Sequence, residues 1–320
     1  MGLKSKVHYL LNGAKNYLHI YNTLESEQFF NDRLYGELIR NVHSIEKGLS
    51  LAETRFGFGF KKILEAMDIA ETLDRVGLEK YSEALNMFAD AVKMYLEFHK
   101  YHNYSDDNIV EIQQKYDCIL KKHESISGCI GGMSIIKRHI YSPDEKSVIN
   151  ALIENRHSVR EFSGESVDSE LLIKAIKLAH HCPSACNRQA YRVHVIDKDQ
   201  FGIFENWFEG MGGFVDQIDK FILITGKHSL YRKEEELQYI VSASVYAGYL
   251  TLALEVEGIG CCFVQRPVVY NTIWSAISKR LNIPEDEQVV CSLGIGSLKE
   301  EYKAPISHRI QLTDIVTFHN

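Results

Sequence analysis

Two short segments of the chain gather side chains that suit a ligand with a phosphate and a polar aromatic ring. The first, residues 156–160, has the sequence R-H-S-V-R. A guanidinium group donates paired hydrogen bonds to a phosphate, and a second arginine neutralises charge at the far end of the same ligand. Because alternate residues of an extended segment point the same way, Arg156, Ser158 and Arg160 are expected to converge on one side of the backbone.

The second segment, residues 182–189, supplies small and amide side chains where a predicted helix ends. Pro183 ends that helix, and Ser184 and Asn187 then present hydrogen-bonding groups in a turn that suits the heteroatoms of a ring. A charged run taken alone favours a solvated surface loop, and the turn taken alone favours a simple connection to the next strand. Together, the two segments indicate a bound flavin.

The charge balance argues against a large polyanionic partner. The 320 residues include 36 Lys and Arg against 43 Asp and Glu, which gives a formal net charge of −7. We therefore expect no broad surface for nucleic acid or for an anionic membrane. The first residues lack the apolar stretch of a secretory signal, and the uncharged run 237–254 includes Gln238, Ser242 and Thr251. These features predict a cytoplasmic protein in which this run is a buried helix.

The seven cysteines are odd in number and include no C-x-x-C pair. This usage favours a reducing compartment, and neither a disulfide framework nor a metal site is expected. Cys182 and Cys186, beside two histidines, are an alternative metal or redox pair, and the adjacent Cys261 and Cys262 are an alternative redox couple. Packing is favoured in both cases, because buried cysteine is common and consecutive strand side chains point to opposite faces.

Hydrophobic spacing divides the chain into a helical first part and a mixed second part. Residues 1–125 repeat apolar side chains at helical spacing. Residues 126–145 are predicted to be a linker, in which Ser142 and Pro143 open a new helix. The rest, 146–320, is predicted to be a mixed α and β domain. The helix that opens in the linker spans about 144–155, further helices are expected at about 168–181, 232–257 and 267–281, and strands at about 191–196, 221–225, 261–264 and 289–295.

The helical part carries one motif that composition alone does not explain. His43, Glu46 and Lys47 share one predicted helical face before Gly48, and an aromatic and glycine cluster follows at 55–60. Composition favours a helix that ends at a glycine and exposes a charged face. The aromatic cluster suggests a cover over a ligand. We hypothesise that the helical part is a lid or a partner-binding surface that shapes the substrate pocket.

Several motifs, in order, resemble the nitroreductase-like family of FMN-dependent oxidoreductases. They are R-H-S-V-R-E-F from residue 156, P-S-A-C-N-R-Q-A-Y from residue 183, V-C-S-L-G-I-G from residue 290 and A-P-I-S-H-R from residue 304. The resemblance covers about residues 145–320 and leaves 1–125 outside. It implies an α+β fold, a three-layer α/β/α sandwich with a central, mostly antiparallel sheet, preceded here by the all-helical N-terminal region.

The resemblance also implies FMN held at the interface of a homodimer, with NAD(P)H as electron donor and a small molecule as substrate. Flavin N5 would carry the hydride, so no side chain is assigned as catalytic. The second motif would reach the ring partly from the other subunit. The residues that match the family's cofactor contacts are Arg156, His157, Ser158, Arg160, Pro183, Ser184, Ala185, Asn187, Gln265, Arg266 and Arg309.

Some departures from the family pattern leave the substrate open. Gln265-Arg266 replaces an acidic residue plus glycine found in many members, which puts the nicotinamide preference and substrate access in question. The leading function is transfer of hydride from NAD(P)H to a small electron-poor or conjugated organic substrate. The alternatives are a redox-silent flavin-binding or scaffold protein and a flavin-fragmenting or dehalogenating relative. Gly294-Ile295-Gly296 does not complete a dinucleotide-binding motif and is expected to be a close packing point in the sheet.

Overall fold

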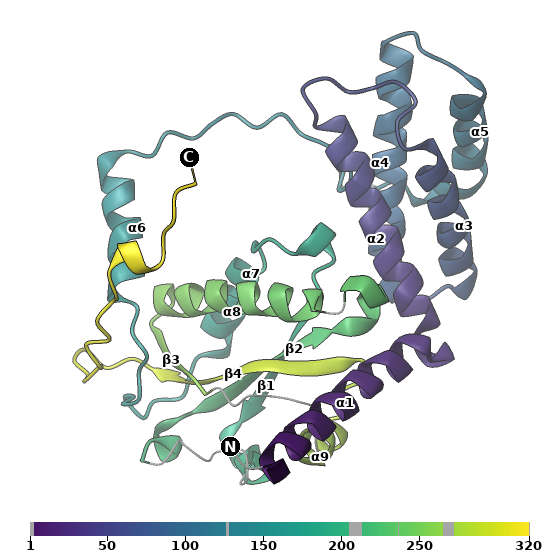
Figure 1. Cartoon of the computed structure of the whole chain (residues 1–320). Helices are drawn as coiled ribbons and strands as arrows, with labels where there is room; N and C mark the ends of the chain where they lie inside the picture. The colour runs from purple at the N-terminus through teal and green to yellow at the C-terminus, as the bar shows by residue number, and fades with distance from the viewer. Residues whose placement is uncertain (1–2, 126–127, 205–212, 236, 265–271, 320) are drawn as a thin grey trace.

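The computed structural model describes residues 3–125, 128–204, 213–235, 237–264 and 272–319. A helical first part is followed by a second part in which helices pack on one sheet (Figure 1). The helices of the first part are α1 (Leu3–Glu25), α2 (Phe30–Leu49), α3 (Phe60–Val76), α4 (Ser82–Tyr101) and α5 (Asp107–Lys115). The second part contains α6 (Pro143–Asn155), α7 (Ser169–Ala179), β1 (Tyr191–Asp197), β2 (Lys220–Lys227), α8 (Gln238–Val256), β3 (Ile259–Phe263), α9 (Thr272–Arg280) and β4 (Glu287–Ser297).

The N-terminal helices have a hydrophobic core of their own. Helix α2 packs against α3 and α4, and Val42, Ala66 and Phe88 are fully buried among them. All the buried residues of this cluster lie between Leu38 and Leu120. The helical spacing seen in the sequence therefore reflects one shared apolar interior, as expected when amphipathic helices pack face to face.

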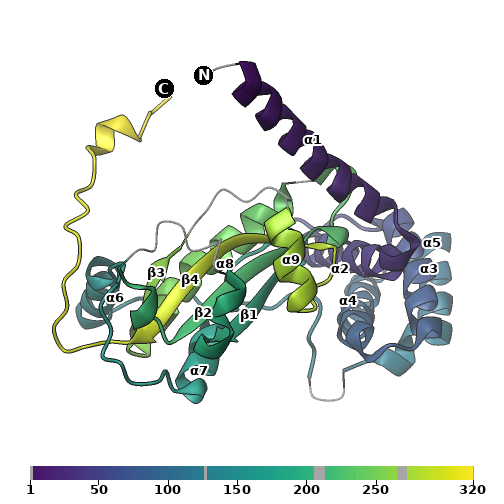
Figure 2. The same cartoon turned by 90° about the horizontal axis from the view of Figure 1, so that it is seen from below.

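The strands of the second part form one antiparallel sheet in the order β1-β2-β4-β3. Successive side chains of β2 point to opposite faces. Ile222 and Ile224 pack with the helices α7 and α8, whereas Phe221 and Leu223 pack with Trp274 of α9. Helices thus cover both faces of the sheet (Figure 2). The α+β fold class predicted from the sequence, with helices preceding a central antiparallel sheet, is confirmed.

Two glycines let other side chains approach β4 closely. A Cβ atom on Gly294 would lie 2.4 Å from Cδ1 of Ile218, and one on Gly296 would lie 2.6 Å from the ring of Phe162. A larger residue at either position would have to displace a buried neighbour. The prediction that this segment is a close packing point is confirmed.

The segment that joins the two parts is held at both ends. The carboxylate of Asp90, on α4, accepts hydrogen bonds from the backbone N–H groups of Ser125 and Ile130, at 3.2 and 2.8 Å. At the other end, Ser142 and Glu145 form a capping box with Pro143 in the first turn of α6. The predicted start of this helix is confirmed.

Helix α8 differs from the buried helix expected at 232–257. It begins at Gln238, after a short 3-10 turn, Lys233–Glu235, and it exposes Val241, Tyr249 and Val256 on the side away from the sheet. By length and composition, the segment Lys233–Val256 is apolar enough to cross a membrane, and half of its apolar window is buried inside the protein. The expectation of a buried helix is therefore corrected, because only one side of α8 packs in the core.

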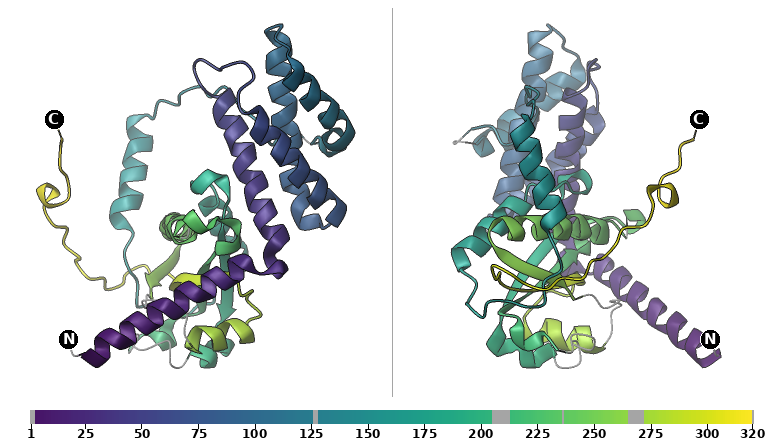
Figure 3. Two further views of the ribbon diagram at one scale, coloured as in Figure 1. Left: turned by 45° about the vertical axis from the view of Figure 1, so that its right-hand side comes forward. Right: turned by 90° about the vertical axis from the view of Figure 1, so that its left-hand side faces the viewer.

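Two segments extend away from the packed body (Figure 3). Helix α1 projects at the N-terminal end, and the chain after β4 runs past α6 toward the C-terminus. In this last segment Ile306 and Phe318 are 94% and 85% exposed. The described part of the chain therefore leaves a run of apolar side chains in this segment without a cover.

Candidate functional site

The first motif leaves α6 and runs along the edge of the sheet. Arg156 ends α6 in an extended conformation, with φ −65° and ψ 115°. Ser158 then forms a parallel bridge with Cys261 of β3, and the N–H of Val159 donates to the Cys261 carbonyl at 2.9 Å. Because Val159 is fully buried, this pairing fixes how the residues on either side of it emerge at the edge of the sheet.

A cavity of about 520 Å³ lies between this motif and the C-terminal segment. Arg156 and Arg309 both line this cavity, although 153 positions separate them in the sequence. Its lining offers guanidinium, imidazole and hydroxyl donors, the set that suits a phosphate ester. The residues that line it are Ile153, Glu154, Arg156, His157, Ser158, Pro305, Ile306, Ser307, His308 and Arg309.

The ring of His157 is oriented by the backbone at the end of α6. Its Nδ1 lies 2.5 Å from the Asn155 carbonyl oxygen, which can only accept, so Nδ1 carries the hydrogen and Nε2 is left for another partner. Glu255 of α8 lies near the charge of Arg156, and burial raises the pKa of its carboxyl above the ordinary value, against the opposing effect of this guanidinium.

Arg160 does not converge with Arg156 and Ser158, as strict alternation of side chains would predict. Its guanidinium carbon lies 5.7 Å from the centre of the Phe214 ring, and it is not among the residues that line the cavity. His157 takes part in the lining instead. The Arg160 guanidinium instead turns back toward its own backbone and donates to the Ser158 carbonyl at 3.4 Å.

The second motif forms a tight loop between α7 and β1. Three of its residues other than glycine, Cys186, Asn187 and Gln189, have positive φ angles of 52°, 54° and 48°. The loop is tied internally, because the Ser184 hydroxyl accepts from the Gln189 N–H at 3.0 Å and the Gln189 amide donates to Asn187 Oδ1 at 3.1 Å. The N–H of Ala185 donates to the Ser242 hydroxyl of α8 at 3.3 Å.

The two motifs lie at opposite ends of α8 within one chain. Ser242 contacts the second motif, and Glu255 lies beside the first. The thirteen steps from Ser242 to Glu255 span about 20 Å of helix at a rise of 1.5 Å per residue. The structure therefore brings together Arg156, His157, Ser158 and Arg309, and separates them from Pro183, Ser184, Ala185 and Asn187. Gln265 and Arg266 lie outside the described residues.

The aromatic and glycine cluster at 55–60 packs against the C-terminal end of α4, with the Phe56 ring about half exposed. The Phe56 ring stacks on Tyr104 with centroids 4.9 Å apart, and the Tyr95 hydroxyl donates to the Phe58 carbonyl at 3.0 Å. Glu46 accepts from the N–H of Gly132 at 3.3 Å, in the joining segment. This motif thus holds the helical part together and ties it to the linker.

The cysteines in the described residues are free thiols. Burial raises the pKa of Cys261 to about 12, and burial likewise raises the pKa of Cys182 and Cys262. The hydroxyl of Tyr191 lies 3.0 Å from Nδ1 of His180, so this histidine has a structural partner. Packing is therefore the role that the structure supports for Cys182, Cys261 and Cys262, whereas Cys186 is only half-buried.

We expect the thiols to differ strongly in reactivity toward a thiol-specific alkylating reagent at mildly alkaline pH. Cys118 and Cys129 are exposed, whereas Cys261 is buried with a pKa raised to about 12. A thiolate is the reactive form, so Cys261 should be labelled about a thousandfold more slowly than an ordinary thiol. Peptide mass spectrometry over a time course measures each site, and equal labelling of Cys261 and Cys118 in the folded protein would contradict this assignment.

The sequence did not single out Arg188 as a functional residue. The structure places it at the centre of the contacts that hold the loop of the second motif. Its side chain is buried and pairs with Glu235. The charged run at 232–235, which interrupts the apolar pattern before α8, was the sequence feature that could have indicated a partner for Arg188. His308 was also missed as a lining residue, although it lies next to Arg309 in the C-terminal motif.

The fold and the cavity define an α+β protein with an arginine- and histidine-lined site at the edge of an antiparallel sheet. Residues 153–211 match the model described as the nitroreductase family. This match includes the first two motifs and confirms the family resemblance found in the sequence, with the N-terminal helical region left uncovered. No curated protein matches the chain.

Several solved structures are similar to the second part of the chain. An FMN-dependent nitroreductase from Clostridium difficile is 26% identical, and the match covers 53% of this chain and 99% of that chain with a TM-score of 0.45. The nitroreductase ydfN from Bacillus subtilis is 20% identical, with 54% and 100% covered and a TM-score of 0.46. An NADH dehydrogenase/NAD(P)H nitroreductase from Parabacteroides distasonis is 16% identical, with 53% and 97% covered and a TM-score of 0.45.

Proposed function

We propose that this protein is an FMN-dependent oxidoreductase that takes hydride from NAD(P)H and passes it to a small electron-poor or conjugated organic substrate. The observation that carries the proposal is the cavity that joins Arg156 and Arg309. Two guanidinium groups with neighbouring hydroxyls are a donor set that fits the phosphate of FMN. The match of residues 153–211 to the nitroreductase family supports the same cofactor.

The residues of the chain would bind and orient the cofactor. Arg156 and Arg309 would neutralise the phosphate, and the hydroxyl of Ser158 would donate to it or to the ribityl chain. When bound, FMN supplies the hydride acceptor and donor at N5, so the protein needs no nucleophile of its own. Arg160 is the cation that we propose for the pyrimidine edge of the ring, where positive charge favours the reduced state.

We further propose that the active form is a homodimer. The two motifs lie about 20 Å apart along α8, so the second motif of one chain would complete the site that begins at the first motif of its partner. The apolar stripe on the outer side of α8, with Val241, Tyr249 and Val256, and the uncovered C-terminal segment supply the apolar area that an obligate dimer buries.

The test is anaerobic titration of the protein with NADH and with NADPH after reconstitution with FMN. We expect bound flavin to lose its visible absorbance on reduction and to regain it when a nitroaromatic or quinone substrate is added. Bound flavin that neither nicotinamide bleaches would indicate a redox-silent flavin-binding protein. Absorbance that is lost for good on aeration would indicate a flavin-fragmenting enzyme, and failure to bind FMN would overturn the proposal.

A further inference from the structure

The N-terminal helices pack directly on the loop that carries the second motif. Helix α2 lies against the 185–187 turn and against the turn at His228–Leu230. Tyr35 of α2 packs in an apolar cluster that draws on α1, this loop and the start of α8. The other members of this cluster are Ile20, Leu24, Ala185, Ala190, Leu230, Tyr231, Tyr239 and Val290.

Arg188 is the charged centre of this contact. Its side chain is 1% exposed, and its two terminal nitrogens donate to the carboxylate of Glu235 at 2.8 and 2.6 Å. The same guanidinium donates to the Leu230 carbonyl at 3.1 Å and to the Ala185 carbonyl at 3.3 Å, and it lies 4.0 Å from the centre of the Tyr231 ring. Arg188 therefore ties the backbone of the loop to the segment before α8.

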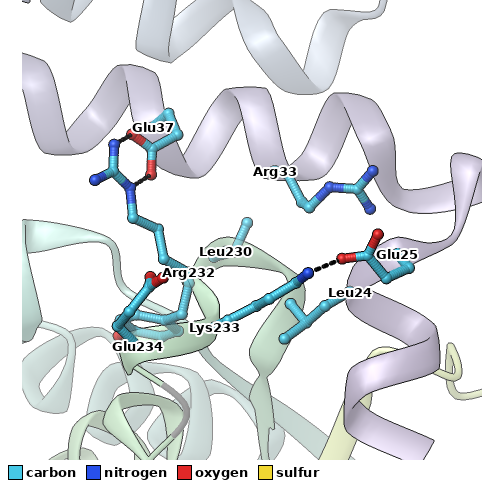
Figure 4. A pocket seen from close by; sticks show the side chains of 9 residues that line it. Leu24, Glu25, Arg33, Glu37, Leu230, Arg232, Lys233 and Glu234 are labelled. Atoms are coloured by element: carbon cyan, nitrogen blue, oxygen red, sulfur yellow. Dashed lines mark hydrogen bonds and ion pairs between the residues drawn. The ribbon is translucent and has the colours of Figure 1, made fainter.

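The ion pair continues onto α2. Glu235 also accepts from the N–H of Arg232 at 3.2 Å, and the Arg232 side chain donates to both carboxylate oxygens of Glu37 at 2.6 Å each. Arg40 donates to the same carboxylate at 2.6 Å. Figure 4 shows Arg232 reaching across to Glu37 of α2, at the rim of a cavity of about 400 Å³ between the two parts of the chain.

The loop needs external support because of its backbone. Cys186, Asn187 and Gln189 all have positive φ angles, a backbone conformation that costs energy for residues other than glycine. Such a conformation persists when its surroundings over-determine it. The surroundings here are Arg188 from within the loop, Glu235 before α8 and α2 from the N-terminal part.

We propose that Arg188 is a positioning residue for the flavin site, and that α2 acts on the same site through Glu37, Arg232 and Glu235. The N-terminal helical part is then a support that sets how tightly FMN is held, rather than a lid over the substrate. This inference rests on the proposed function, because it assumes that the 184–189 loop contacts FMN. It assigns a role to residues that lie outside the matched cofactor contacts.

The test compares FMN affinity and apoprotein stability in the full chain. Glu37→Gln removes the pair between α2 and Arg232 without touching the loop, and Arg188→Lys keeps the charge but loses the paired geometry. We expect Glu37→Gln to weaken FMN binding about tenfold, and Arg188→Lys to weaken it at least as much. The double variant should be less than additive, because both changes act on one network.

The control is Asp68→Asn, which removes an ion pair within the helical part, Lys115–Asp68 at 3.2 Å, and lies away from the 184–189 loop. Fluorescence quenching of FMN gives Kd, and thermal melting of the apoprotein gives stability. A purely structural role would lower the melting temperature of Glu37→Gln and leave its Kd equal to that of Asp68→Asn, and this result would overturn the inference. Because Glu37 lies outside the 184–189 loop and its variant keeps the shape of the side chain, Glu37→Gln decides the question even if Arg188→Lys does not fold.

The outcome for the wild-type protein separates the two proposals. Wild-type protein that binds FMN, with Glu37→Gln binding equally well, would overturn this inference and leave the proposed function standing. Wild-type protein that does not bind FMN would overturn the proposed function, and this inference with it.

Discussion

Replacing Arg156 with glutamine is expected to weaken FMN binding about 10- to 150-fold, which corresponds to a loss of about 1.5–3 kcal/mol for a charge-assisted contact. Arg156 lines the same cavity as Arg309, and both are proposed to face the phosphate. Glutamine keeps a donor but loses the charge and the paired geometry. Titration of the apoprotein with FMN, monitored by fluorescence quenching, measures the effect.

The control for this variant is Arg75→Gln, because Arg75 is an exposed arginine in the helical part whose side chain is 70% exposed. The salt dependence of binding gives a second readout, since removal of one cation should make the affinity less sensitive to ionic strength. An Arg156→Gln protein that binds FMN as tightly as Arg75→Gln would contradict the placement of the phosphate in this cavity.

Mixing two variants tests whether the two motifs act from different subunits. Asn187→Asp changes the second motif and keeps a side chain that tolerates the positive φ of this position. A heterodimer of Arg156→Gln and Asn187→Asp chains would have one site with both motifs intact. Random reassembly should therefore restore tight FMN binding in about one quarter of the sites. No recovery on reassembly, with each variant alone still dimeric, would show that one chain supplies both motifs.

Gly36→Ala is expected to destabilise the protein by about 1–3 kcal/mol, even though alanine is the better helix former. A Cβ atom on Gly36 would lie 2.4 Å from the carbonyl oxygen of Leu230 and 2.9 Å from its carbonyl carbon. These are backbone atoms, so relief requires α2 to move away from the second part of the chain. Denaturant unfolding of the apoprotein measures the change.

The matched control is Gly13→Ala in α1, where the added Cβ would meet no atom within 4 Å. That change should stabilise the protein by up to about 1 kcal/mol, through helix propensity alone. If Gly36→Ala stabilised the protein as much as Gly13→Ala, α2 would not lie in close contact with the backbone of Leu230. The proposed support of the 184–189 loop by α2 would then be contradicted.

The sequence alone determined the elements and the family resemblance. The helices before residue 125, the capped start of α6 at Ser142 and the apolar strands of the second part all follow from local features. Spacing of apolar side chains, a capping box and a proline act within a few residues of the chain. The motifs around Arg156 and Ser184 were recognisable for the same reason, because each is a short continuous run.

Tertiary structure alone decided which of these residues meet. The pairing of Val159 with Cys261 fixes the first motif at the edge of the sheet, where Arg160 is not among the residues that line the cavity. The path of the C-terminal segment places Arg309 in the same lining as Arg156. The length of α8 keeps the two motifs apart within one chain. The role of Arg188 in positioning the 184–189 loop follows only from the tertiary structure, in which the segment before α8 and helix α2 pack against this loop. These contacts join residues far apart in sequence, and they depend on how whole elements pack, which no local pattern encodes.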